Sequence, residues 1–324
     1  MSLAIGLANK KSIMITPTPP FNFEGTIYNP GHFPTPTEKY EDGIFWQTMR
    51  FLNEEFGLKF ENEGATNNPE VKLTIYSKNK LTKEKLKIIT GELNYRFEFN
   101  RDISEFCEKF KNDKLLELVL RRWKGMRIKC GYSLYESLII YIILQNATVR
   151  RTVQMSNNLF ENFGTKVKFD NKEFHVFWKS DQLNKVSEDK LRELKLGYRA
   201  KSIKKVSESF SKNEFNEIEL RKLSNEELKK ELIQIYGIGP ASVWYLLFEV
   251  FHRYDALDYI SPWEQKIYSK ILFDKELAES KKILDFLNQK YGKYKMLAAH
   301  CLFTDLFWRH KKKKINWLEK EIRL

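Results

Sequence analysis

The spacing of hydrophobic residues divides the chain into two parts. In the first hundred residues, short apolar runs rich in β-branched and aromatic side chains predict strands at 13–15, 43–46, 71–76 and 95–99. Between the last two runs, Leu86, Ile89 and Leu93 recur at helical spacing and predict a helix over 82–93. We therefore expect an α+β N-terminal domain with an antiparallel sheet over residues 1–101.

From residue 102 onwards the helical period dominates, and no proline occurs before Pro240. Apolar residues at three- and four-residue spacing predict helices at 103–110, 115–123, 134–144, 149–163, 188–194, 200–210, 225–235, 240–251, 262–272, 279–290 and 294–308. This pattern predicts a second, all-α domain with many helices over residues 102–324.

The composition of the chain indicates which kind of binding partner and which cell compartment to expect. Lys and Arg outnumber Asp and Glu by 56 to 43, a formal net charge of +13, which favours a polyanion such as nucleic acid. A lysine-rich soluble surface is the alternative interpretation. No apolar run is long enough to span a bilayer, and Lys10 and Lys11 interrupt the first apolar stretch, so we expect a soluble, intracellular protein without a membrane partner.

The three cysteines give no sign of a metal site. Cys107, Cys130 and Cys301 lie far apart, and the chain has no CxxC motif or Cys/His cluster. We expect no metal and no other cofactor, and the cysteine usage fits a reducing compartment.

One short motif predicts a phosphate-binding turn. Ser224 and Glu227 form a capping box that opens a helix, and this helix breaks at Gly237-Ile238-Gly239. The glycines permit a tight turn, and Pro240 suits the first position of the next helix. Such a turn directs backbone N–H groups outward at a helix N-terminus, where they can bind phosphate oxygens. An ordinary helical hairpin is the alternative, but the basic composition favours DNA as the ligand of this turn, including Ser242.

Residues 232–242 (LIQIYGIGPAS) resemble the hairpin of the helix-hairpin-helix DNA glycosylases. Within that superfamily the chain is most similar to 8-oxoguanine DNA glycosylase. Residues 191–200 (LRELKLGYRA) are similar to that family's Leu-Gly-Leu-Gly-Tyr-Arg-Ala stretch, and residues 135–155 resemble its apolar helix with an Asn-rich turn. The similarity extends from about residue 20 to about residue 308. It implies that the protein binds DNA and flips a base out of the duplex.

The resemblance implies a role for each matching residue. Asn146 and Arg151 would face the opposite strand and its unpaired base, while Tyr198 and Arg199 would enter the gap left in the base stack. From the residues alone, the alternative for Asn146 is a helix C-cap. Tyr198 could likewise be a half-buried core residue.

Two further residues would lie near the flipped base. The resemblance implies this for the backbone of Gly31 and for the ring of Phe303. For Phe303 the apolar stripe of its own helix favours a core position instead.

The chain departs from the family at both catalytic positions. The lysine that attacks the sugar in bifunctional members is replaced by Ala241, which can form no Schiff base. Monofunctional members need instead an aspartate about twenty residues further on. Aligning the next helix on Trp263 and Ile267 places Ser261 at that position.

Ser261 has a second interpretation as a helix cap. Pro262 and Glu264 follow it as in a capping box. The nearest acids are Asp258 and Glu264, and either could supply the missing negative charge, although capping is the favoured role of Glu264.

The leading hypothesis is a monomeric base-excision repair glycosylase that binds double-stranded DNA containing a damaged base. It would flip an oxidised or alkylated purine and hydrolyse its N-glycosidic bond, without lyase activity from the usual lysine. The alternative is a catalytically silent protein that binds lesions or DNA structures. Either departure, at Ala241 or Ser261, could also be a laboratory substitution.

Overall fold

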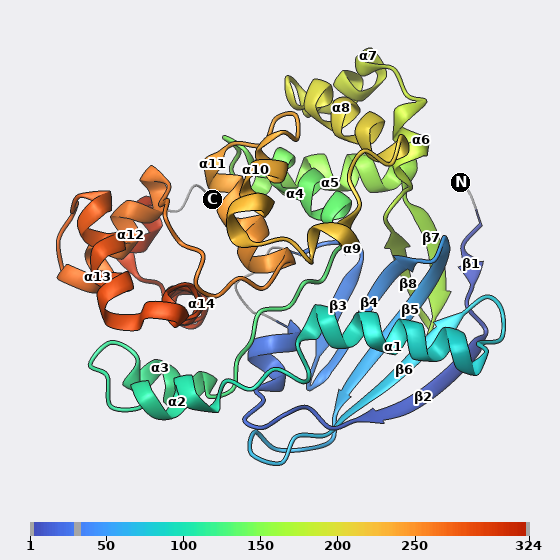
Figure 1. The fold of residues 1–324 in the computed structure, drawn as a ribbon. Coiled ribbons are helices and arrows are strands. Elements are labelled where there is room, and N and C mark those ends of the chain that lie inside the picture. Colours follow the sequence, from blue (N-terminus) through green and yellow to red (C-terminus); the bar gives the residue numbers. More distant parts are fainter. Residues whose placement is uncertain (1–2, 29–33, 322–324) are drawn as a thin grey trace.

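The N-terminal part of the chain folds around an antiparallel sheet. The computed structural model describes residues 3–28 and 34–321, and within them this sheet has five strands in the order β2-β6-β5-β4-β3 (Figure 1). The strands are β2 (Asn9–Ile15), β3 (Glu38–Glu41), β4 (Ile44–Phe51), β5 (Glu54–Asn62) and β6 (Val71–Ser77). The predicted antiparallel sheet is therefore confirmed, and three of its strands contain runs that the sequence predicts.

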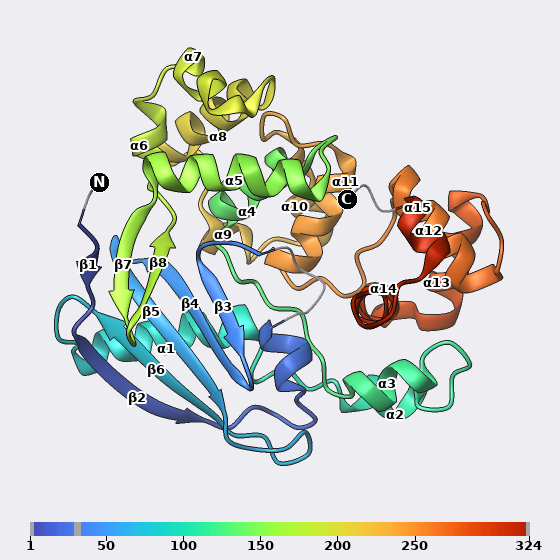
Figure 2. The ribbon, with the colours of Figure 1, turned by 180° about the vertical axis from the view of Figure 1, so that it is seen from behind.

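Alternating side chains bury both faces of this sheet. Phe45 of β4 points to the face covered by helix α1 (Lys83–Phe97), and its neighbour Trp46 points to the other. A hairpin of β7 (Thr165–Phe169) and β8 (Lys172–Val176) packs on that other face, with β1 (Ile5–Gly6) parallel to β7 (Figure 2).

The strand predicted at 95–99 is wrong, because α1 continues through Phe97. Phe97 extends the four-residue repeat of Ile89 and Leu93 on the buried face of the helix. Arg96 pairs with Glu92 one turn earlier at 2.7 Å, which suits a helix and not a strand.

The remainder of the chain is mainly helical. Its α-helices are α2 (Ser104–Phe110), α3 (Glu117–Trp123), α4 (Leu134–Leu144), α5 (Val149–Phe163), α6 (Ser180–Asn184), α7 (Glu188–Leu191), α8 (Arg199–Ser211), α9 (Glu217–Leu220), α10 (Asn225–Ile233), α11 (Pro240–Tyr245), α12 (Pro262–Phe273), α13 (Ser280–Tyr291), α14 (Lys295–Lys312) and α15 (Asn316–Glu321). Short helical turns of other types are η2 (Arg192–Leu196), η3 (Leu246–Val250) and η4 (Gly292–Tyr294), and a further one, η1 (Glu24–Tyr28), lies in the N-terminal part.

The predicted fold class, an antiparallel sheet followed by a multi-helix part, is confirmed. The exception is the β7–β8 hairpin, which interrupts the helical part and packs on the N-terminal sheet. The division into domains at residues 101 and 102 falls between α1 and α2, and it stays a prediction.

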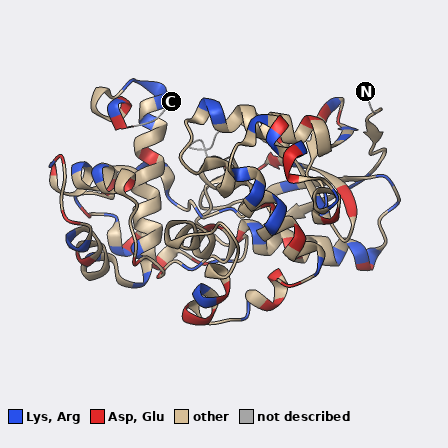
Figure 3. Ribbon diagram, turned by 90° about the horizontal axis from the view of Figure 1, so that it is seen from above, with Lys and Arg blue, Asp and Glu red and all other residues tan. Residues whose placement is uncertain are grey.

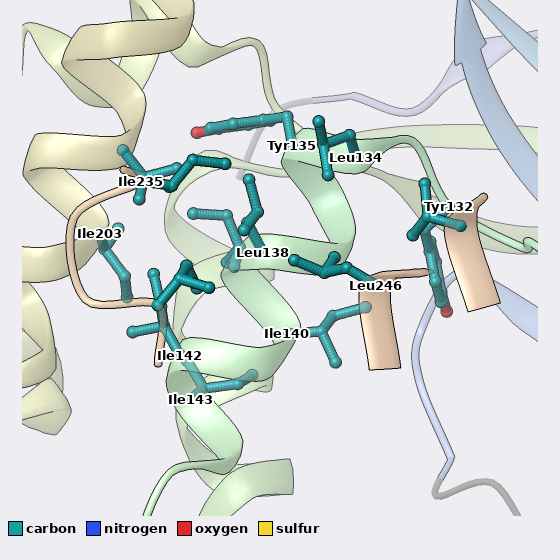
Figure 4. Packing of buried hydrophobic residues seen from close by; sticks show 14 of the residues in the cluster. Tyr132, Leu134, Tyr135, Leu138, Ile140, Ile142, Ile143, Ile203, Ile235 and Leu246 are labelled. Atoms are coloured by element: carbon teal, nitrogen blue, oxygen red, sulfur yellow. The ribbon is translucent and has the colours of Figure 1, made fainter. Parts of the chain in front are cut away.

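The helical part has two apolar cores. One lies around α4, where Leu138 and Ile142 face Ile203 of α8 (Figure 4). The other is built from α2, α3 and α12 to α14. At η3, Leu247 packs into the first core and Phe248 into the second, so this turn joins the two. The segment from α11 to η3 therefore lies where the two halves meet.

The positive surplus is spread over the molecule. Figure 3 shows Lys and Arg on many helices, interleaved with Asp and Glu. In the part of the chain that the structure describes, no helix is long and apolar enough to cross a membrane.

Candidate DNA-binding and catalytic site

The hairpin between α10 and α11 has the predicted geometry. Ser224 caps α10, with its N–H donating to the Glu227 carboxylate at 3.0 Å and its hydroxyl accepting from the Glu227 N–H, so the capping box is confirmed. Gly237 adopts a φ of +81°, a left-handed conformation that favours glycine. Gly239 then caps α11, and Pro240 occupies its first turn as predicted.

Several N–H groups of this hairpin have no partner in the part of the chain that the structure describes. The N–H of Ile238 donates to the carbonyl of Ile235 at 3.1 Å. Within residues 3–28 and 34–321, no acceptor receives the N–H of Gly239, Ala241 or Ser242. Free donors at the start of a helix can bind a phosphate oxygen, which the helix dipole also favours.

Tyr198 stands beside the hairpin and is exposed. Its ring follows a tight turn in which Lys195 and Gly197 both have positive φ, and 53% of the residue's surface is accessible. The Tyr198 hydroxyl donates to the Gln145 carbonyl at 3.3 Å and lies 3.5 Å from the Asn146 amide nitrogen. The structure thus brings Tyr198 and Asn146 together, and the half-buried core position is not the one that Tyr198 takes.

Two arginines, Arg199 and Arg151, form hydrogen bonds to backbone carbonyls at and beside this turn. Arg199 is only 7% exposed; its guanidinium donates to the Gln145 carbonyl and lies 4.6 Å from the Tyr198 ring centre. Arg151 donates to the carbonyl of Lys195 in the turn itself. A carbonyl and an aromatic face thus hold the charge of Arg199 inside. The entry of Arg199 into the gap of the base stack stays a prediction.

Ser261 is the N-cap of α12, as its second interpretation predicts. Its hydroxyl donates to the Glu264 carboxylate at 2.8 Å and accepts from the Glu264 N–H. Asp258 instead lies at the surface, with 58% of its side chain exposed and ion pairs to Lys229 at 3.4 Å and Lys295 at 3.5 Å. Of the two acidic candidates, Asp258 is exposed and Glu264 is half-buried.

Glu264 is a half-buried carboxylate that accepts hydrogen bonds from uncharged donors. Burial raises its pKa above the usual range, and hydrogen bonds from Tyr245 and Ser261 oppose this effect. Among the described residues, no Lys, Arg or His forms an ion pair with it. An unpaired carboxylate in such a place can stabilise a positive charge that arrives or develops beside it.

Tyr245 connects Glu264 to the position of the family's lysine. It follows Ala241 by four residues and so lies on the same face of α11, one turn on. Burial, together with the neighbouring Glu264, raises the pKa of Tyr245 well above its usual value, so the phenol stays a neutral donor. The sequence interpretation missed Tyr245, although counting one turn from Ala241 would have found it.

A second tyrosine–carboxylate pair lies further along this face. The Tyr141 hydroxyl of α4 donates to Glu249, which follows Tyr245 by four residues. The rings of Tyr141 and Tyr245 are 6.1 Å apart. The two pairs therefore form one polar row where the two cores meet.

Of the two residues implied near the flipped base, the structure describes Phe303. Phe303 is half-buried on α14, stacked on Phe307 at 4.4 Å and edge-on to Trp263 at 5.7 Å. Its contacts include the second core, which agrees with the apolar stripe of its helix. Gly31 lies outside the described residues.

Comparison with known proteins identifies the family. Residues 139–315 match the model of the HhH-GPD superfamily base excision DNA repair protein, a segment that contains the hairpin, Tyr198 and the Glu264 site. The chain belongs to this superfamily. The resemblance to helix-hairpin-helix DNA glycosylases is thereby confirmed.

Two curated proteins that the chain resembles carry the name of a glycosylase. The DNA-3-methyladenine glycosylase of Bacillus subtilis is 24% identical over 152 residues, which are 47% of this chain and 50% of that protein. The N-glycosylase/DNA lyase of Saccharomyces cerevisiae is 31% identical over 129 residues, 36% of this chain and 34% of that one. The chain thus spans half or less of the length of these relatives.

Solved glycosylase structures share the fold over nearly the whole chain. The 3-methyladenine DNA-glycosylase of Archaeoglobus fulgidus superposes with a TM-score of 0.74 at 16% identity, covering 92% of this chain and 99% of its own. The apo 8-oxoguanine glycosylase/lyase of Clostridium acetobutylicum gives 0.70 at 22% identity, covering 91% and 97%. The shared fold therefore includes the N-terminal sheet as well as the HhH-GPD segment.

Proposed function

We propose that this protein is a monofunctional DNA glycosylase of base-excision repair, with Glu264 as its catalytic carboxylate. The observation that carries the proposal is the carboxylate of Glu264, which has no cationic partner among the described residues and is linked through Tyr245 to the face of Ala241. Its charge would serve in place of the aspartate that Ser261 replaces.

The proposed reaction is hydrolysis of the N-glycosidic bond. As the bond between the sugar C1′ and the base nitrogen breaks, its electron pair leaves with the base and positive charge develops on the sugar. A carboxylate close to that charge stabilises it. Water then adds to C1′: one of its protons stays on the new C1′ hydroxyl, and the other leaves through a base such as Glu264 and ends on the released base or on solvent. Ala241 offers no amine, so the product is an intact strand with an abasic site.

The DNA-facing residues support the binding part of the proposal. The N–H groups of Gly239, Ala241 and Ser242, which find no acceptor among the described residues, would bind a backbone phosphate. Tyr198 would fill the space left by the flipped base, with Asn146 facing the opposite strand. Filling this gap offsets part of the few kcal/mol that unstacking costs.

Among damaged purines, an N-alkylated base fits the site best. Alkylation at a ring nitrogen gives the base a positive charge, which the Glu264 carboxylate and the aromatic rings of Trp263 and Phe303 would attract. The 3-methyladenine glycosylase among the relatives agrees with this choice. An oxidised purine, which is neutral, is the second candidate, because the solved relatives include 8-oxoguanine glycosylases.

A catalytically silent lesion-binding protein is the alternative function. The observation in its favour is that Ala241 and Ser261 together replace both family catalytic side chains. Such a protein would keep the hairpin and Tyr198 and bind lesion DNA in a salt-dependent manner without turnover.

A duplex series decides between these functions. Duplexes that contain an N-alkylated purine, 8-oxoguanine, hypoxanthine or uracil are incubated with the protein, and strand breaks are counted with and without alkali. We expect breaks only after alkali, and Glu264→Gln should slow base release at least about a hundredfold. The matched control Asp258→Asn removes the surface acid and should leave the rate unchanged. Binding without any base release would instead establish the silent protein, and breaks without alkali would overturn the role of Ala241.

A further inference from the structure

Gln145 lies where the end of α4, the hairpin and the turn that carries Tyr198 meet. It is the C-cap of α4, directly before Asn146. Its side-chain amide donates to the backbone carbonyl of Gly237 in the hairpin at 2.8 Å. Its own backbone carbonyl accepts from the hydroxyl of Tyr198 and from the guanidinium of Arg199. One residue thus contacts both the hairpin and the turn that carries Tyr198.

The bond to Gly237 affects how the hairpin presents its donors. The Gly237 carbonyl is committed to the Gln145 amide and is therefore directed toward the protein. The next peptide groups supply the N–H donors of Gly239, Ala241 and Ser242, which have no partner in the described part of the chain. Fixing one carbonyl inward orients the following turn, so the side chain of Gln145 helps to set the direction of the phosphate-binding groups.

A second contact links the same two segments. Gly237 packs against Ser202, which lies on α8 one turn after Arg199. Tyr198 directly precedes α8, so a shift of the hairpin would be transmitted to the base of the Tyr198 turn. The hairpin and Tyr198 are therefore held together by contacts through Gln145 and through Ser202.

We propose that Gln145 is a positioning residue that couples phosphate binding at the hairpin to insertion of Tyr198 into the base stack. The inference rests on the proposed function, because it assumes that the hairpin binds DNA and that Tyr198 fills the gap. In the coupled arrangement, docking of the phosphate backbone on the hairpin fixes Tyr198 in the orientation in which it enters the duplex.

The variant Gln145→Met tests this role in the full chain. Methionine keeps the length of the side chain but cannot donate, while the backbone carbonyl that binds Tyr198 remains. The matched control is Gln234→Met, in the same hairpin, because Gln234 is exposed and its side chain makes no hydrogen bond within the described residues.

The first measurement needs no DNA. Backbone amide hydrogen exchange is followed in the free protein for residues 235–239 and 195–199. If the two segments are coupled, Gln145→Met should accelerate exchange in both of them by about fivefold or more. This factor corresponds to the free energy of one lost hydrogen bond. Gln234→Met should change neither segment. Faster exchange confined to the hairpin would overturn the coupling.

The second measurement is a double-mutant cycle on duplex DNA with 2-aminopurine beside the lesion, whose fluorescence reports base flipping. Gln145→Met should lower the flipped fraction about fivefold, but by less than about twofold in a Tyr198→Ala background, because the coupled partner is already gone. Equal losses in both backgrounds would overturn the inference. Failure of the wild-type chain to flip the base would instead reject the proposed function, and the exchange experiment would still decide the role of Gln145.

Discussion

Gly237 lies so close to Ser202 that a Cβ atom on the glycine would come within 2.7 Å of the serine hydroxyl oxygen. Its φ of +81° is also one that other residues rarely adopt. Gly239, two residues on, differs in both respects, since a Cβ atom there would meet nothing within 4 Å and φ is −106°. Gly237 is thus required both by its backbone conformation and by its close neighbour, whereas neither reason applies to Gly239.

We predict that Gly237→Ala lowers the free energy of unfolding by about 2 to 3 kcal/mol, through backbone strain and the clash with Ser202. Gly239→Ala is the matched control and should cost less than about 1 kcal/mol, since only its capping position is affected. Urea denaturation of both variants measures these values. Equal losses in the two variants would contradict the distinction drawn between the glycines.

The features that could be predicted from the sequence are those set by neighbouring residues. Capping boxes at Ser224 and Ser261 each involve only four consecutive residues, and both are present as expected. The apolar run of α4 and the apolar residues of α5 at three- and four-residue spacing gave the correct helix bounds for the same reason. The Tyr95-to-Phe99 stretch failed because its alternation is short, whereas the helical repeat before it is long and continues through it.

The β7–β8 hairpin was missed although its signal is present. Asp170 and Asn171 form a two-residue turn with φ of 48° and 59°, the left-handed pair that joins adjacent antiparallel strands. The positions of Tyr245 and Arg199, by contrast, depend on contacts with residues distant in sequence, Glu264 and Gln145. No local pattern specifies those contacts, and only the folded chain brings them together.

Glu98 should make stability depend on pH. It is 7% exposed, receives a hydrogen bond from Tyr254 and pairs with Arg101 at 3.1 Å, yet burial dominates and raises its pKa to about 7. A raised pKa means that the folded state favours the protonated acid. This contribution is complete below the unfolded-state pKa near 4.5 and is lost as the pH rises through about 7.

The variant Glu98→Gln mimics the protonated acid at every pH. We predict that it flattens the stability curve between pH 4.5 and 7 and raises the free energy of unfolding at neutral pH by at most roughly 3 kcal/mol. Urea denaturation at pH 5 and pH 7.5 measures the effect. A wild-type protein that is more stable at pH 7.5 than at pH 5, with the difference removed by Glu98→Gln, would contradict this sign.

The pH dependence of base release should report on Glu264. The carboxylate must be ionised to stabilise positive charge, and burial holds its pKa above the usual range. Activity should therefore fall as the pH drops through this raised pKa, at a higher pH than for an exposed glutamate. Single-turnover rates on an N-alkylated duplex from pH 4.5 to 8.5 measure the acid limb. Glu264→Asp should have a low rate that still falls at acidic pH. A wild-type rate that stays constant down to pH 4.5 would rule out an ionised Glu264 in the reaction.

Tyr245 should act on the reaction through Glu264. Its hydroxyl donates to this carboxylate and so lowers the pKa of Glu264 against the effect of burial. Removing the donor in Tyr245→Phe leaves the ring packing but raises the pKa of Glu264 further, so the acid limb of the rate profile should move to higher pH. The rate at neutral pH should fall about tenfold, the effect of one lost hydrogen bond to a charged group.

The shift of the limb separates this role from a structural one. A phenylalanine that merely loosened the packing would lower the rate equally at every pH and leave the limb in place. Tyr259→Phe is the matched control, because Tyr259 is 38% exposed and its hydroxyl bonds to nothing in the described part of the chain. If both variants gave the wild-type profile, the hydrogen bond from Tyr245 would have no part in setting the charge of Glu264. A shift in Tyr245→Phe alone would identify the Tyr245 hydroxyl as a donor that lowers the pKa of Glu264.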